Sequence, residues 1–149
     1  MDRTVQVGTV ELRVETFGEA AYPAILLIAG GASAPRAWPE EVCARLAAGL
    51  RFVIRSGAPV ALDTPHSLDE LAAQAVGLLD AVAAGHAHIV GRALAGAIAR
   101  RLAVEHPDRT DTLILISTRE PGTQHEPDRS ERGQQRVRAW KCRRRWSSP

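Results

Sequence analysis

The first 28 residues change from an alternating to a continuous hydrophobic pattern. Residues 10–17 (VELRVETF) alternate between apolar and polar positions, which is the pattern of a strand with one buried face. Together with residues 4–7 and the intervening Gly8, they predict an antiparallel hairpin with one solvent-exposed face. Residues 24–28 (AILLI) are apolar throughout and predict a short strand that is covered on both faces.

A helical spacing follows this strand. Within residues 38–50, Val42, Leu46 and Leu50 recur every four residues, so we expect a helix that buries this stripe. Pro39 lies near its start, where the missing N–H of proline leaves no helical hydrogen bond unmade.

A second helical stretch carries a start signal and a stop signal. Ser67 and Glu70 have the S-x-x-E spacing of a capping box, in which each side chain binds the other residue's backbone N–H. Gly85 lies just after the last apolar residue and is the expected helix stop. The apolar stripe between these signals comprises Leu68, Leu71, Ala72, Ala75, Leu78, Leu79 and Val82.

Short apolar strands alternate with these helices. The pattern predicts strands at residues 51–54, 88–90 and 112–117, and a helix at residues 94–105 that ends before Pro107. The order ββ–β–α–β–α–β–α–β implies right-handed crossovers and a mostly parallel sheet with helices on both faces. The predicted fold class is therefore α/β, with an antiparallel N-terminal hairpin.

The C-terminal segment has no hydrophobic period and is rich in charge. Residues 132–149 contain seven basic residues and no acidic one, so the preceding residues carry a net charge of −5 within a chain total of +2. We expect a core domain over residues 1–118 and a loop with a flexible basic tail over residues 119–149. Trp140 and Trp146 interleave with the basic residues, as in binders of polyanions, but an aperiodic tail predicts only weak binding without nucleic-acid specificity.

Composition narrows the class of protein. Hydrophobic residues make up 45% and aromatic residues 4% of the 149 residues, which favours helices packed on a sheet over an all-β sandwich. Cys43 and Cys142 are too few for a disulfide framework, and the N-terminus lacks the apolar core of a signal peptide. No apolar run reaches the roughly 18 residues of a membrane span. We expect a cytoplasmic protein with reduced thiols, without a membrane partner, metal or cofactor.

Three segments give the chain a resemblance to a known family. They are AILLIAGGAS…WPEEVCARLAAGLRFVIR, SLDELAAQAVGLLDAV and AHIVGRALAGAIARRLAVEHPDRTDTLILIS, and the match runs from about residue 7 to residue 118. In order and spacing they are similar to an α/β-hydrolase of the actinobacterial esterase type, including the aclacinomycin methylesterase-like group. The resemblance implies the N-terminal half of that fold. It also implies the family's activity, which is hydrolysis of carboxylic esters or related bonds by a serine nucleophile.

The turn after the strand at residues 88–90 corresponds to the family's nucleophile elbow. That elbow has the pattern G-x-S-x-G, and its sharp turn lifts the serine hydroxyl above the sheet. The matching residues here are Gly91-Arg92-Ala93-Leu94-Ala95, followed by Gly96. Ala93 replaces the serine, and an alanine side chain has no group that attacks a carbonyl. The resemblance therefore implies an elbow that forms no acyl-enzyme.

Of the family's other catalytic elements, this sequence matches some and lacks others. Its oxyanion hole uses two backbone N–H groups, for which the resemblance points to Gly31 and Leu94. Its acid and histidine follow on later strands, where this chain has only His125, in the charged segment PGTQHEPD. The segment SGAPVALDTPHS, which follows the strand at residues 51–54, also lacks the family's turn D-x-R-G-x-G-x-S. We expect the other histidines to be loop, strand-edge or helix-end residues: His66, His86, His88 and His106.

These differences predict a shortened family member or pseudoenzyme, with esterase activity that is absent or very weak. A small-molecule ester is the expected substrate class if any activity is kept. A non-catalytic binding or interaction module is the alternative. Without the family's later strands and last helix, the strand at residues 112–117 would be an exposed edge, and uncovered apolar sheet surface would favour self-association.

The same turn also supports a different interpretation. GRALAG is close to the dinucleotide-binding fingerprint G-x-G-x-x-G, with Ala93 at the middle glycine and Arg92 beside the expected pyrophosphate. The ribose-binding acid of that fingerprint should lie at the end of the next strand. There the sequence has Ser117-Thr118-Arg119, and Glu120 comes later. This departure makes nucleotide binding the weaker prediction.

Overall fold

The structure, a computed structural model, describes residues 1–28, 38–59, 67–116 and 137–141. The strands in these ranges are β1 (Asp2–Val7), β2 (Val10–Phe17), β3 (Ala24–Ile28), β4 (Phe52–Pro59), β5 (Ala87–Arg92), β6 (Thr110–Ile116) and β7 (Val137–Lys141). The helices are α2 (Glu40–Ala48), α3 (Leu68–Ala81), α4 (Leu94–Glu105) and the short 3-10 helix η1 (Pro107–Arg109).

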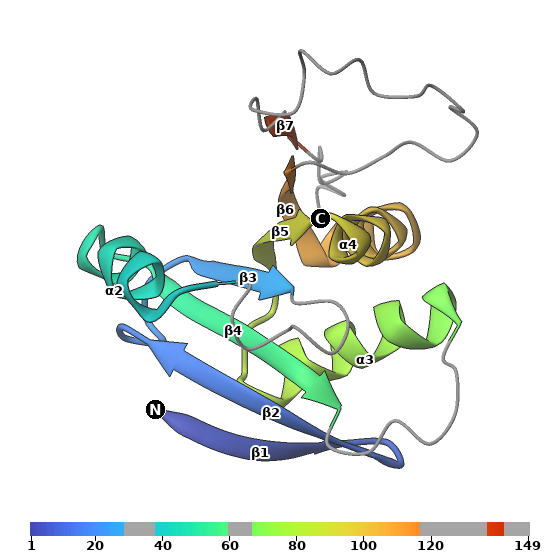
Figure 1. The fold of residues 1–149 in the computed structure, drawn as a ribbon, viewed down its shortest axis with the longest axis horizontal. Helices are drawn as coiled ribbons and strands as arrows, with labels where there is room; N and C mark the ends of the chain where they lie inside the picture. Colours follow the sequence, from blue (N-terminus) through green and yellow to red (C-terminus); the bar gives the residue numbers. More distant parts are fainter. Residues whose placement is uncertain (29–37, 60–66, 117–136, 142–149) are drawn as a thin grey trace, which may run out of the picture.

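All of these strands join one sheet in the order β1-β2-β4-β3-β5-β6-β7. The central strands β4, β3, β5 and β6 are parallel to one another, whereas β1–β2, β2–β4 and β6–β7 pair antiparallel. Figure 1 shows the N-terminal hairpin at one edge of the sheet and β7 at the other. The predicted α/β class, with its parallel centre and N-terminal hairpin, is confirmed.

Apolar layers cover both faces of the sheet. α3 and α4 pack on one face, where Leu26, Ile54 and Ile89 of the central strands are fully buried. α2 packs on the opposite face, over Leu27 and Val53. Because successive residues of a strand point to opposite faces, β3 supplies side chains to both layers and is buried at all five positions.

The start of α3 follows the prediction from sequence. The backbone N–H of Glu70 donates to Ser67 Oγ at 3.2 Å, and the backbone N–H of Ser67 donates to the Glu70 carboxylate at 2.7 Å. This reciprocal capping box is the predicted one. Most of the predicted stripe is buried, but Leu68 is 44% exposed, because it lies in the first turn beyond the edge of the apolar layer.

The end of α3 differs from the prediction. Ala83, not Gly85, takes the left-handed conformation after the helix, with φ of +57°. The turn closes when Ala84 donates its backbone N–H to the carbonyl oxygen of Leu79 at 2.9 Å. Arg109 then donates to the carbonyl oxygens of Ala84 and Gly85 at 3.2 and 2.5 Å. These tertiary contacts hold an alanine in a conformation for which sequence rules favour glycine.

The buried face of α2 also differs from the prediction. Cys43 is its fully buried residue, whereas Val42 and Leu50 are 39% and 58% exposed. Leu46 and Ala47 pack against the apolar layer beside Cys43. The buried stripe is therefore 43-46-47, rotated by one residue from the predicted one, because Cys43 packs as an apolar side chain.

A strand at residues 137–141 was not predicted. β7 pairs with β6 over its whole length, from Thr112 opposite Lys141 to Ile116 opposite Val137. The expectation that β6 forms an unpaired edge was therefore wrong. The sequence pattern did not indicate β7, because the strand is short and basic residues surround it. A strand of five residues needs a partner, and the N–H and C=O groups along the edge of β6 supply one. The remaining residues of the predicted tail lie outside the described residues, so its flexibility stays a prediction.

None of the described helices has the length and apolar character that a membrane span requires.

Candidate functional site

The turn between β5 and α4 is the candidate functional site. β5 lies in the parallel centre of the sheet, where Gly91 is opposite Ile28 of β3 and Leu115 of β6. Ala93 follows β5 directly, at the carboxyl end of the parallel strands, and its side chain is exposed. Ligands of open α/β sheets bind at this end of the strands.

The backbone of Ala93 has an unusual conformation. Its φ of +53° and ψ of −122° lie far from the right-handed and extended regions that alanine prefers. Such a residue costs roughly 1–3 kcal/mol and persists only where its surroundings hold it. Here the backbone N–H of Ala93 donates to the carbonyl oxygen of Ile116 at 3.0 Å, and its carbonyl accepts from the N–H of Gly96 at 3.0 Å. A hydrogen bond from each side thus fixes the turn.

Small residues allow β5 and α4 to meet at this turn. A Cβ atom on Gly91 would lie 2.6 Å from the carbonyl oxygen of Ala95, 2.7 Å from Gly96 Cα and 2.8 Å from Ala99 Cβ. Two of these three atoms belong to the backbone and cannot move aside. The sequence GRALAG therefore has a steric role, because only a glycine at its first position lets the helix start this close to the strand.

The start of α4 presents backbone N–H groups beside Ala93. Leu94 is the first residue of this helix, and the first four N–H groups of a helix have no carbonyl partner within it. α4 has no acidic residue in its first turn and no side-chain cap, so its partial positive charge is not offset by a carboxylate from that turn. Leu94 stands at the helix start, and its role as an oxyanion donor stays a prediction. Gly31, the other predicted donor, lies outside the described residues, so the pair stays a prediction.

The structure does not bring a histidine to Ala93 within the described part of the chain. His86 precedes β5, and His106 follows α4. At about 3.3 Å per strand residue, His86 lies roughly 20 Å from Ala93, at the opposite end of β5. His88 lies within β5, opposite Ile25 and Thr112. His66 and His125 lie outside the described residues.

Cys43 offers no alternative nucleophile at the turn. It lies on the buried face of α2, and burial raises the pKa of its thiol. The thiol is therefore protonated at neutral pH, whereas only the thiolate is a strong nucleophile. Among the described residues no group of three His, Cys, Asp or Glu side chains is arranged to hold a metal ion. Glu120, which the dinucleotide interpretation would need, lies outside the described residues, so that interpretation stays a prediction.

Sequence reasoning missed one polar pair. His86 Nδ1 lies 2.5 Å from Asp111 Oδ2, although the two residues are 25 positions apart in the chain. Both stand at the amino ends of neighbouring parallel strands. The predicted strands at residues 88–90 and 112–117 could have indicated that His86 and Asp111 lie close together. The residues just before two adjacent parallel strands lie near one another.

Solved structures share this fold. The 2-hydroxy-6-oxo-6-phenylhexa-2,4-dienoate hydrolase BphD from Rhodococcus sp. strain RHA1 matches with a TM-score of 0.75 at 24% identity, over 85% of this chain and 49% of that chain. The thioesterase domain from the curacin biosynthetic pathway matches with a TM-score of 0.73 at 21% identity, over 83% of this chain and 48% of that chain. These likenesses show that the chain has the α/β-hydrolase fold, over about half the length of each solved structure.

Sequence relatives narrow this class. Rhodomycin D methylesterase DauP from Streptomyces sp. (strain C5) is 38% identical over 122 residues, which cover 76% of this chain and 41% of DauP. Rhodomycin D methylesterase DnrP from Streptomyces peucetius is 37% identical over 123 residues, with the same coverage. The RutD hydrolase from Variovorax paradoxus (strain S110) is 32% identical over 111 residues, or 71% of this chain and 42% of RutD. The chain thus spans about 41% of the length of its methylesterase relatives, and no family model matches it.

Proposed function

We propose that this chain is an esterase-like pseudoenzyme, in which hydrolysis of carboxylic esters through the 91–96 elbow is absent or very weak. The observation that carries the proposal is Ala93 at the tip of the turn, in a strained conformation at the carboxyl end of β5. The ligand class that we assign is a carboxylic ester, because two relatives at 38% and 37% identity are methylesterases.

The remaining features of the elbow do not replace the missing nucleophile. An oxyanion hole stabilises the charge that develops after a nucleophile has attacked the carbonyl. In serine hydrolases, loss of the nucleophile alone costs about as much as loss of the whole triad, a factor of about 10⁶ in kcat. The N–H groups at the start of α4 therefore support binding of an ester carbonyl much better than its cleavage.

A direct assay compares the unaltered chain with Ala93→Ser on a panel of p-nitrophenyl esters. We expect both proteins to hydrolyse the esters at the background rate, because no described histidine lies near the restored hydroxyl. Arg92→Gln is a matched control, since Arg92 is the exposed neighbour of Ala93. Turnover by the unaltered chain that Gly91→Ala abolishes, and that Arg92→Gln leaves intact, would contradict the proposal.

Self-association as a non-catalytic module is the second candidate. Ile114 and Ile116 are only half-buried on the face of the sheet that α2 covers. The main contacts of α2 are with β4 and β2, and the two isoleucines lie at the rim of the apolar layer under this helix. A second copy of the chain that presents the same two isoleucines would bury both patches in a symmetric contact.

Size-exclusion chromatography with light scattering tests this second candidate. We expect the mass of the unaltered chain to rise towards that of a dimer as concentration increases, and Ile114→Lys to lower the association. Arg101→Gln, on the opposite side of the molecule in α4, is the control. A monomer at every concentration would exclude self-association and leave the pseudoenzyme proposal untouched.

A further inference from the structure

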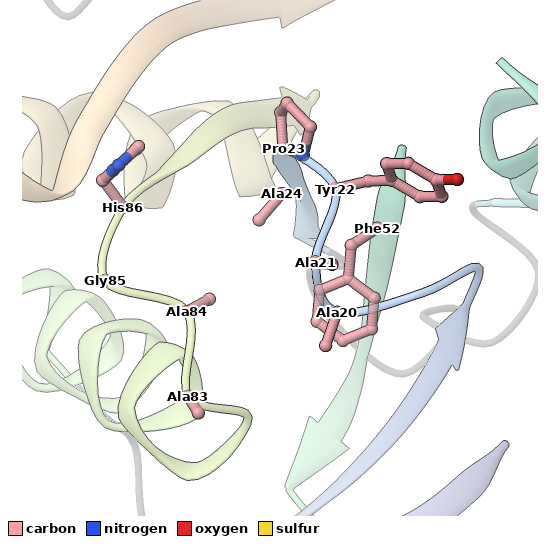
Figure 2. Close-up of a pocket in the computed structure, with 10 residues that line it drawn as sticks. All are labelled: Ala20, Ala21, Tyr22, Pro23, Ala24, Phe52, Ala83, Ala84, Gly85 and His86. Carbon is pink, nitrogen blue, oxygen red and sulfur yellow. The ribbon is translucent and has the colours of Figure 1, made fainter. Parts of the chain in front are cut away.

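We draw no further inference here: the strongest candidate, the pocket between residues 20–24 and 83–86 at the amino ends of β3 and β5 (Figure 2), carries none, because nothing in the described part of the chain shows what it would hold.

Discussion

The two ends of the parallel strands differ in what they offer. At the carboxyl end, the turn at Ala93 has a strained, tightly packed backbone beside the start of α4, but no reactive side chain at its tip. At the amino end, His86 and Asp111 form a polar pair beside a pocket, while the backbone around them is held by Arg109. The first end has the backbone conformation expected of an elbow, and the second has the polar side chains.

This difference shows that the shape of an elbow and its chemistry depend on different residues. The shape needs Gly91, because a Cβ atom there would meet backbone atoms of α4. It also needs the hydrogen bond from Ala93 to β6. Neither requirement involves the side chain at the tip, so replacing a serine by alanine leaves the turn intact. The fold is consequently evidence for the superfamily and not for the activity.

The largest expected effect comes from breaking the carboxyl end. Gly91→Ala should lower the free energy of unfolding by about 3 kcal/mol, because its methyl group would lie against two backbone atoms that cannot retreat. Gly85→Ala is the matched control at the amino end. A Cβ atom there meets nothing within 4 Å, so its effect should stay within about 1 kcal/mol. Denaturant unfolding of both variants measures the difference, and equal losses would contradict the close packing.

A smaller effect is expected from breaking the amino end. Arg109 is 19% exposed and donates to two backbone carbonyls and to the carboxylate of Asp80. Arg109→Met should lower the free energy of unfolding by about 2 kcal/mol, since these acceptors lose their donors.

Arg101→Met is the comparison for this variant. Arg101 of α4 pairs with Asp69 of α3 and with Glu105 on the exposed surface, where solvent screens the charges and ion pairs contribute little. Thermal unfolding of the two variants should therefore show a clearly larger loss for Arg109→Met. If Arg101→Met lost as much stability as Arg109→Met, the Arg109 contacts would not be what stabilises the amino end.

The sequence predicted the parts of the fold in which one local signal dominates. Alternation in the hairpin, the apolar run of β3 and the Ser67–Glu70 capping box each correspond to an observed element. The glycine-flanked turn after β5 was also found where its small residues predicted it. These signals are strong because each follows from backbone geometry within a few residues.

The errors share a physical cause, which is that contacts distant in sequence decided the outcome. Ala83 replaces Gly85 at the end of α3 because Arg109, from beyond α4, holds the turn. β7 forms because β6 offers an edge. The predicted strands placed His86 and Asp111 near one another, but their contact depends on a bulge in β6 that no residue of the local sequence indicates. Gly31 and His125 lie outside the described residues, so the structure leaves those two assignments as predictions.

The smallest expected effect tests the central claim most directly, namely that the turn keeps the strained conformation of an elbow around an alanine. The measurement is the free energy of unfolding of Ala93→Gly beside Ala97→Gly, which lies one turn further along α4. Glycine adopts positive φ without strain, so Ala93→Gly should stabilise the protein by about 1 kcal/mol. Ala97→Gly should destabilise it by about 1 kcal/mol, as glycine does within a helix. Equal destabilisation by both substitutions would show that Ala93 is not strained and would contradict the account.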